Sequence, residues 1–285
     1  MKYVFINPLS NNKKGNIAKN ELLKMFSEKD LVFCDVTTIE NVSSSLQSLK
    51  DDDEIIIAGG DGTLTRFVND IYNLKLKQNI YLFPCGSGND FYNDIKENFP
   101  KNEKLILINK YFETLPQVFV NGINRHFING IGCGIDGYCC EVGDKIRETS
   151  NKEVNYTIIA LIGLLFKYKP CNAKITVDGV TKEYTNVWLS PTMIGRFYGG
   201  GMMITPEQER LNKEKTVSSG VCFCKSKLKI LSVFPKIFKG THISHTEIYE
   251  IRKGKEVTVE LDRPVALQID GETVTGVTSY TVKYN

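Results

Sequence analysis

The sequence predicts an α/β domain built on a parallel sheet, followed by a β-rich domain. Strand and helix patterns alternate over the first ~115 residues, as in a doubly wound α/β fold. Short strand patterns dominate after Pro116. The length of 285 residues suits about two domains of ~150 residues each. We therefore place the domains at 1–116 and 117–285, and a return of the last few residues to the first domain stays an open alternative.

Local patterns define the elements of the first domain. Tyr3–Ile6 is an aromatic and β-branched run that ends at Asn7-Pro8, as a strand would. Glu54–Ala58 is apolar through its centre without alternation, which is typical of a strand buried on both faces of a parallel sheet. Further strands are expected at 31–36 and 80–83, and helices at 16–26, 43–49 and 64–71.

The second domain is expected to be mainly β. Asp178-Gly179 lies between two apolar runs and is a hairpin signal. Two helical segments, 154–168 and 226–238, interrupt the strands. The predicted strands are 117–120, 125–129, 173–177, 183–189, 216–224, 257–261 and 280–284.

Composition and charge exclude several classes of protein. Hydrophobic residues make up 41% and charged residues 24%, which excludes a disordered chain, a collagen-like repeat and a coiled-coil rod. The net charge of +3 is too small for a dedicated nucleic-acid binder, so no nucleic-acid partner is expected. The longest apolar run, Ile158–Phe166, is far shorter than the ~20 residues of a membrane span.

A glycine turn, Gly59-Gly60-Asp61-Gly62-Thr63, follows the predicted buried strand and opens the next helix. Glycines let the backbone approach a ligand closely, and a helix N-terminus attracts phosphate. The Asp61 carboxylate would repel that phosphate unless a cation lay between them, which indicates a divalent metal such as Mg²⁺. The alternative is a tight turn in which Asp61 caps a helix.

A second glycine turn, Cys85-Gly86-Ser87-Gly88-Asn89-Asp90, follows the next strand. The carboxyl ends of parallel strands meet at one edge of a sheet, where α/β folds bind ligands. Both turns and the loop Asn7-Pro8-Leu9-Ser10 are therefore expected at the same edge, and together they predict a nucleotide site. The sequence has neither the P-loop motif nor a clean Gly-x-Gly-x-x-Gly fingerprint.

These motifs together resemble the diacylglycerol-kinase catalytic-domain family, which includes bacterial diacylglycerol and other lipid kinases and the sphingosine and ceramide kinases. The first turn is shared with the NAD kinases, whereas the Gly-Ser-Gly-Asn-Asp and Asp-Gly-Glu elements favour the lipid kinases. The resemblance covers essentially the whole chain. It rests on Asn7-Pro8-x-Ser10, the two glycine turns, Gly132-x-Gly134-Ile135-Asp136, Gly199-Gly200-Gly201-Met202 with Pro206, Lys239-Gly240-x-His242 and Asp270-Gly271-Glu272.

The resemblance implies a Rossmann-like domain of the NAD-kinase and diacylglycerol-kinase type that binds ATP, and a β-sandwich domain that provides the lipid site. It implies transfer of the γ-phosphate of ATP to a hydroxyl of diacylglycerol or a related lipid. Asp270 and Glu272 are carried over as the catalytic carboxylates, and Asp61, Asp90 and Asp136 as the set that organises Mg²⁺. Thr37 fits nearly as well as Thr38 in the nucleotide set. That set is Asn7, Ser10, Thr38, Gly59, Gly60, Asp61, Gly62, Thr63, Gly86, Ser87 and Asn89.

Two segments depart from the family's pattern. Thr65-Arg66 stand where the family usually has Asn-Glu, so that glutamate's contact is in doubt, and Arg66 is expected to add positive charge near the nucleotide. After Pro206 the family commonly has an Asp-Gly pair that serves a structural Mg²⁺ site, whereas residues 207–215 contain neither residue. We predict that this structural metal site is lost, and a metal bound by Asn212 and its neighbours would contradict that.

Five lysines alternate with apolar residues between Lys225 and Lys239. A basic amphipathic segment can lie on an anionic membrane, where each lysine contributes ~1 kcal/mol. A helix packed on the core with solvated lysines stays open as the alternative. The N-terminus lacks a signal-peptide pattern, so we expect a cytoplasmic protein that meets its lipid substrate at an anionic membrane surface, peripherally and reversibly. A homodimer is left open.

Two other functions stay open. An NAD-kinase-like enzyme would phosphorylate a soluble hydroxyl, and a regulator would bind nucleotide or lipid without turnover. Thr65-Arg66 and the missing Asp-Gly pair are the features that keep the regulator open. The retained carboxylates Asp61, Asp90, Asp270 and Glu272 argue against it.

Overall fold

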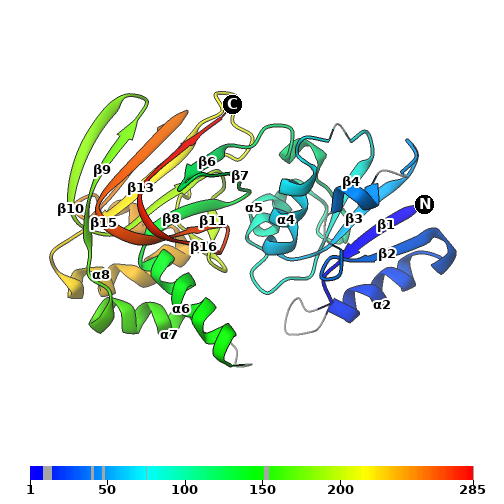
Figure 1. The fold of residues 1–285 in the computed structure, drawn as a ribbon, viewed down its shortest axis with the longest axis horizontal. Coiled ribbons are helices and arrows are strands. Elements are labelled where there is room, and N and C mark those ends of the chain that lie inside the picture. Colours follow the sequence, from blue (N-terminus) through cyan, green and yellow to red (C-terminus); the bar gives the residue numbers. More distant parts are fainter. Residues whose placement is uncertain (9–14, 40–41, 47–48, 75, 151–153, 285) are drawn as a thin grey trace. The chain divides into compact units, whose positions relative to one another are not determined.

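The computed structural model describes residues 1–8, 15–39, 42–46, 49–74, 76–150 and 154–284. The chain forms two compact units, Met1–Leu115 and Pro116–Asn285 (Figure 1). This division lies one residue from the boundary predicted from the sequence. The last strand pairs with a neighbour in the second unit through Lys283, so the C-terminal residues stay in that unit.

The first unit is built on a five-stranded sheet with strand order β2-β1-β3-β4-β5. Four strands are parallel, and β5 runs antiparallel to β4, so the predicted α/β fold with a parallel sheet is confirmed. The strands are β1 (Lys2–Ile6), β2 (Leu31–Asp35), β3 (Glu54–Gly59), β4 (Asn79–Pro84) and β5 (Ile106–Leu107). The helices are α2 (Gly15–Met25), α3 (Val42–Leu46), α4 (Asp61–Ile71) and α5 (Asp90–Ile95), with 3-10 turns at Glu28–Asp30, Lys96–Asn98 and Asn109–Tyr111.

Helices cover both faces of this sheet, because alternate side chains of each strand point to opposite faces. Val4 and Ile56 pack with Leu22 of α2 in one core cluster. On the other face the ring of Phe5 meets that of Phe67 in α4, with centroids 5.3 Å apart. The apolar centre of β3 is thus buried on both faces, as its sequence predicts.

The second unit is built on an antiparallel nine-stranded sheet in the order β14-β13-β10-β8-β15-β16-β6-β7, with β9 pairing β10 and β15. This confirms the predicted β-rich fold. A separate short ribbon joins β11 (Phe197–Tyr198) to β12 (Met202–Met203). The other strands are β6 (Gln117–Val120), β7 (Ile123–His126), β8 (Gly130–Gly134), β9 (Cys171–Val177), β10 (Val180–Met193), β13 (Val217–Phe223), β14 (Tyr249–Gly254), β15 (Glu256–Ile269) and β16 (Glu272–Lys283).

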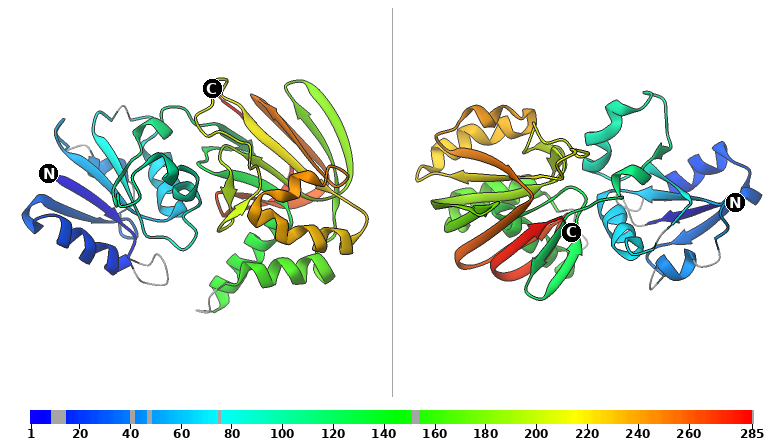
Figure 2. Two further views of the ribbon diagram at one scale, coloured as in Figure 1. Left: turned by 180° about the vertical axis from the view of Figure 1, so that it is seen from behind. Right: turned by 90° about the horizontal axis from the view of Figure 1, so that it is seen from above.

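Three helical segments lie on one face of this large sheet, as Figures 1 and 2 show from opposite sides. They are α6 (Ile135–Thr149), α7 (Tyr156–Ile162) with its π-helical continuation η4 (Gly163–Lys167), and α8 (Lys227–Val233) with the 3-10 segment η5 (Phe234–Lys239). A further 3-10 turn covers Thr241–Ser244. Pro235 stands in the first turn of η5, where the α-helix stops. Within the described ranges, no helix is long and apolar enough to cross a membrane.

Candidate functional site

The two glycine turns of the first unit pack directly against each other. They follow the adjacent parallel strands β3 and β4, and the Cys85 amide donates to the Gly59 carbonyl at 3.1 Å. A Cβ on Gly60 would lie 2.8 Å from the Gly86 Cα, and a Cβ on Gly86 would lie 2.4 Å from the Gly60 Cα. Neither position has room for a side chain. The two turns can therefore pack together at one sheet edge, as predicted, because both positions are glycine.

The Asp61 carboxylate joins the first turn to the second. Its Oδ2 accepts the backbone N–H of Asp90 at 2.9 Å, and its Oδ1 accepts that of Phe91 at 2.8 Å. These are the first two amides of α5, which have no partner inside the helix. Asp61 therefore caps a helix, as the alternative reading of the sequence expected, although the helix is α5 and not its own helix α4.

Asn89 braces the second turn. Its backbone is left-handed with φ 51°. Its side-chain oxygen accepts the Gly86 N–H, and its side-chain amide donates to the Gly86 carbonyl, both at 2.9 Å. Asn89 occupies the N-cap position of α5 but makes no capping hydrogen bond there. Since its side chain is used on Gly86, the cap comes from Asp61.

Two positions of the turns remain open toward solvent. A Cβ on Gly62 would meet no atom within 4 Å, and Ser87 is exposed. By contrast, Thr63 is buried and packs over Gly59, where a Cβ would lie 2.5 Å from the Thr63 Cβ. Protein packing thus explains Gly59, Gly60 and Gly86, whereas no protein atom within 4 Å requires a glycine at position 62.

The remaining predicted nucleotide residues lie on neighbouring loops. Asn7 directly follows β1 and is partly buried, and Ser10 is outside the described residues. Thr38 donates its hydroxyl to the Asp35 carbonyl at 3.0 Å, whereas Thr37 bonds the Asp35 carboxylate through its hydroxyl and amide at 2.6 and 2.8 Å. Both threonines are exposed.

Arg66 connects the loop after β2 to α4. Its guanidinium donates to the Val36 carbonyl at 2.8 Å and to the Ile39 carbonyl at 3.0 Å. The sequence suggested only a positive charge near the nucleotide. The structure gives Arg66 a bracing contact on the loop that carries Thr38, and no local sequence pattern indicates that contact.

In the second unit, Asp270 forms the tight turn between β15 and β16. Asp270 and Gly271 have φ of 46° and 90°, which suits a two-residue hairpin turn. The Asp270 carboxylate accepts three backbone N–H groups, from Ile128 at 2.7 Å, Asn129 at 2.9 Å and Gly130 at 3.0 Å. Three accepted bonds use most of the lone pairs of a carboxylate, so this geometry suits a positioning residue better than a proton acceptor.

Glu272, the second carboxylate of the predicted catalytic pair, is placed differently. It opens β16, its side chain is 57% exposed, and its Oε2 lies 2.6 Å from Nη1 of Arg125 on β7. Glu272 is the more exposed of the two carboxylates, since Asp270 is only partly exposed. Arg125 was not identified from the sequence, because only the sheet register brings β7 near the hairpin.

Asp136 begins α6 within the second unit. Its Oδ1 accepts the Gly137 amide at 2.8 Å, and the Tyr198 hydroxyl donates to its Oδ2 at 3.4 Å. Burial raises the pKa of Asp136 to about 6, against the opposing effect of the Gly137 hydrogen bond. A Cβ on Gly132 would lie 2.1 Å from the Asp136 Oδ2, so this carboxylate lies directly over the backbone of β8.

The three carboxylates predicted to organise Mg²⁺ do not form a ligand set within either unit. Both oxygens of Asp61 accept backbone amides, Asp90 is 5% exposed, and Asp136 packs inside the second unit. Across the described ranges, no three His, Cys, Asp or Glu side chains are grouped as a metal ion requires. Asp61 and Asp90 belong to the first unit and Asp136 to the second, so the joint role of these three stays a prediction.

The loop after Pro206 is closed by its own side chains. Asn212 accepts the Thr216 amide at 2.8 Å and donates to the carbonyls of Glu209 at 2.8 Å and Thr216 at 2.9 Å. The buried Arg210 donates to the Ile128 carbonyl and to Oδ1 of Asn129, the latter at 2.9 Å. Arg210 and Asp270 therefore hold the same segment, 128–130, from its carbonyl and amide sides.

Known proteins resemble both units. Residues 2–114 match the model of the diacylglycerol kinase catalytic domain, and residues 129–283 match that of the YegS C-terminal NAD kinase beta sandwich-like domain. A Mycobacterium tuberculosis protein named diacylglycerol kinase is 24% identical over 229 residues, covering 78% of this chain and 71% of its own. A crystal structure of a diacylglycerol kinase from Bacillus anthracis str. Sterne superposes with a TM-score of 0.61 at 19% identity, covering 99% and 93% of the two chains.

Proposed function

The chain belongs to the diacylglycerol-kinase catalytic-domain family and is a phosphotransferase of the lipid-kinase type, and from this premise we propose that it transfers the γ-phosphate of ATP to a hydroxyl of diacylglycerol or a related lipid. One observation carries the nucleotide half of this proposal. The glycine at position 62 is required by no neighbouring protein atom, and it stands in the first turn of α4, where backbone amides and the helix dipole attract phosphate.

The proposed nucleotide site depends on how the two turns are held. Phosphoryl transfer requires accurate positioning of the phosphates more than a strong base. Asp61 fixes the start of α5, and Asn89 fixes the Gly86 turn. These contacts support the assignment of the Gly62 backbone and the exposed Ser87 hydroxyl as groups that contact phosphate.

The lipid half of the proposal assigns different roles to the two hairpin carboxylates. Glu272 accepts the proton of the acceptor hydroxyl as the hydroxyl oxygen bonds to phosphorus, with Arg125 fixing its position. Asp270 positions the hairpin through its three amide contacts. Family membership implies that ATP is used with a metal. We propose Mg²⁺ as that metal, and the role of Asp61, Asp90 and Asp136 in organising it stays a prediction.

Peripheral binding to an anionic membrane is part of the proposal. α7 and η4 bury one face in the core through Ile159, Ala160 and Leu164. The opposite face is also apolar and is exposed to solvent. We call this face the apolar ridge, and its residues are Ile158, Leu161, Ile162, Leu165 and Phe166. A surface helix normally presents polar residues there, so the ridge indicates an apolar partner.

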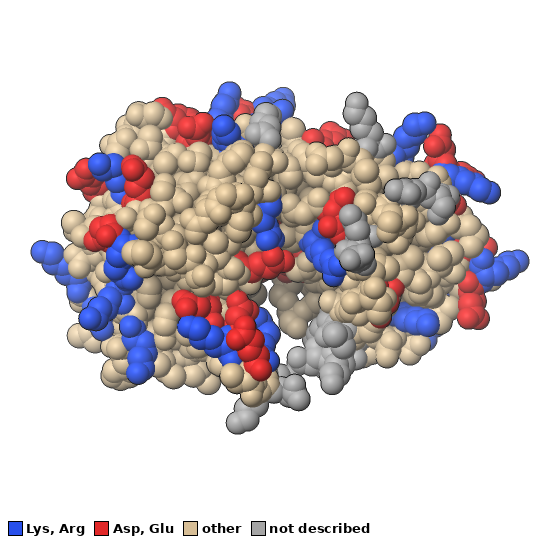
Figure 3. Space-filling model, in the orientation of Figure 1, with Lys and Arg blue, Asp and Glu red and all other residues tan. Residues whose placement is uncertain are grey.

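A lysine-rich segment, α8 with η5, contacts the apolar ridge. The Lys227 ammonium donates to the Leu165 carbonyl at 2.9 Å, which ties α8 to η4. No Asp or Glu occurs in residues 154–169 or 225–240, and Figure 3 shows blue and tan atoms over α8 with little red. Lys225 and Lys239 are exposed, whereas Lys229 pairs with Glu247. Exposed apolar and basic side chains side by side suit the interface of an anionic membrane.

The proposal is tested by phosphate transfer from labelled ATP to diacylglycerol and other lipids in mixed micelles, with NAD as a soluble acceptor. We expect transfer to a lipid, and we expect Glu272→Gln to abolish most of it. Transfer to NAD alone would reject the lipid-kinase proposal. Nucleotide binding without transfer to any acceptor would identify a regulator instead.

A further inference from the structure

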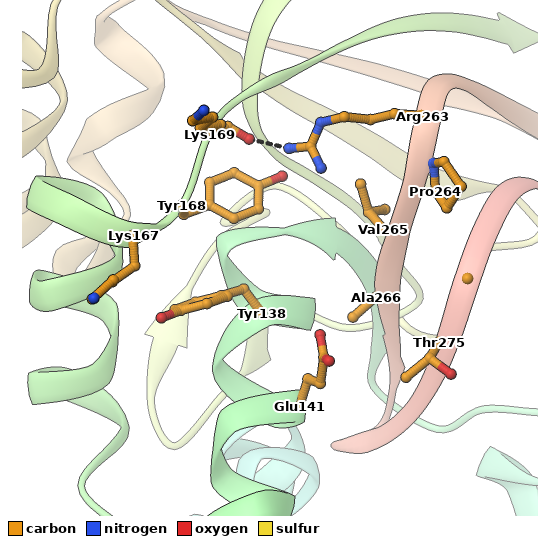
Figure 4. Close-up of a pocket in the computed structure, with 11 residues that line it drawn as sticks. Tyr138, Glu141, Lys167, Tyr168, Lys169, Arg263, Pro264, Val265, Ala266 and Thr275 are labelled. Atoms are coloured by element: carbon orange, nitrogen blue, oxygen red, sulfur yellow. Dashed lines mark hydrogen bonds between the residues drawn. The ribbon is translucent and has the colours of Figure 1, made fainter.

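An open pocket of about 480 Å³ lies in the second unit between α6, the end of η4 and the β15–β16 hairpin (Figure 4). This size lies within the range of ~300–1,000 Å³ that is usual for ligand pockets. The β15–β16 pairing shifts register on both sides of Val265, and Gly276 in the lining has a φ of 70°. Such bulges turn side chains away from the regular strand direction. The irregular part of the hairpin therefore forms one wall of the pocket.

The pocket is strongly cationic. Lys167, Lys169 and Arg263 line it, and in the described part of the chain none of them has a carboxylate within ion-pair distance. The carboxylate in the lining, Glu141, already pairs with Lys145 on α6 at 2.7 Å. Three cations against one carboxylate that is already paired favour an anionic ligand.

The ring of Tyr168 lies beside Arg263 in the lining. The Arg263 guanidinium carbon lies 5.7 Å from the centroid of the Tyr168 ring. Figure 4 shows this guanidinium directed over the pocket, where it donates a hydrogen bond to the Lys169 carbonyl. The Tyr168 ring therefore helps to hold the guanidinium in the lining.

We propose that this pocket binds the phosphate group of an anionic phospholipid. Arg and Lys side chains are the usual partners of phosphate. The apolar ridge supports a lipid source, because Phe166, which is 75% exposed, directly precedes Lys167. Contact of the ridge with a membrane would bring phospholipid head groups to the lysines at the end of η4.

This pocket lies apart from the proposed proton acceptor. Thr273 bonds to Asp144 of α6 at 2.6 Å, and Thr275 lines the pocket. Side chains alternate along a strand, so Glu272 points to the other face of β16. The proposal rests on the proposed membrane association but not on the transfer reaction, and its test measures binding.

The test is sedimentation of the full chain with vesicles of phosphatidylcholine alone or with added phosphatidic acid. We expect Arg263→Gln to weaken binding to the acidic vesicles by about fivefold. Lys255→Gln is the matched control. It removes the same charge about 26 Å from Arg263 along the strand direction, and we expect less than a twofold effect. Circular dichroism confirms that each variant is folded.

Calorimetric titration with inorganic phosphate identifies the source of the ligand. Binding of free phosphate that depends on Arg263, together with vesicle binding that does not, would overturn the lipid source. Equal losses for Arg263→Gln and Lys255→Gln would overturn the pocket itself. Vesicle binding that depends on Arg263, in a protein that transfers phosphate to no lipid, would support the pocket and reject the proposed function.

Discussion

Replacing Asp270 with Asn distinguishes a positioning role from a catalytic one. Asn tolerates the left-handed backbone of this turn, so the hairpin keeps its shape. The amide has only one acceptor oxygen, and its NH₂ group would face either the N–H of Ile128 or those of Asn129 and Gly130. Ile128 and Asn129 are buried, so solvent cannot replace the lost bonds.

The expected loss of stability follows from these contacts. A hydrogen bond to a charged group contributes ~1.5–3 kcal/mol, and an unsatisfied buried donor costs a further ~1–3 kcal/mol. We expect Asp270→Asn to lower the free energy of unfolding of the second unit by ~3 kcal/mol. At ~2–4 °C per kcal/mol for a domain of this size, its Tm falls by ~6–12 °C, which differential scanning calorimetry measures.

Glu272→Gln is the matched comparison. Its ion pair with Arg125 is exposed and contributes ~1 kcal/mol at most, so the Tm changes by ~4 °C or less. Loss of a general base lowers the transfer rate ~10²-fold or more. An Asp270→Asn protein with an unchanged Tm and no transfer would refute the reasoning and would make Asp270 the base.

Three further variants test other parts of the structure. Gly62→Ala leaves the free energy of unfolding in urea unchanged or raises it by up to ~1 kcal/mol, but it weakens ATP binding at least tenfold by calorimetry. The control Gly86→Ala destabilises the protein, because its Cβ meets the Gly60 Cα. ATP binding by Gly62→Ala equal to that of the unmodified protein would contradict the phosphate site. Because the pKa of Asp136 is raised, the folded state binds more protons than the unfolded state between about pH 4 and 6, and the free energy of unfolding falls by ~2–3 kcal/mol as the pH rises through this window. Asp136→Asn makes the free energy of unfolding, measured in urea, depend less on pH. An unchanged pH dependence would show that Asp136 does not cause it. Phe166→Asp leaves the Tm within ~1 °C because the side chain is 75% exposed, yet it reduces vesicle sedimentation at least tenfold; full binding would exclude the apolar ridge from membrane contact.

The sequence predicted which residues gather in the first unit but not which ones touch. The order of strands and glycine turns places Asp61 and Asn89 at one sheet edge, because parallel strands align their carboxyl ends. The contact of Asp61 with the Asp90 and Phe91 amides depends on the packing of Gly60 against Gly86, and no local pattern encodes that packing.

The second unit was harder to predict because its contacts join residues far apart in the chain. The partners of Asp270 precede it by about 140 residues and are set by the pairing of β15 with β8. The predicted strand 257–261 is one part of β15, which runs from Glu256 to Ile269. The register shifts near Val265 interrupt the alternation of apolar residues there. The cationic pocket lies at this irregular part of β15.

The contact between the glycine turns has a consequence for attempts to transplant this site into another scaffold. Neither turn is complete alone, since the first one supplies the cap of α5 and the second one supplies the surface on which Gly60 rests. A graft of residues 59–63 without residues 85–91 would leave the Asp61 carboxylate without its amide partners. A transplant must therefore include both loops and the two adjacent parallel strands, β3 and β4, that hold them in register.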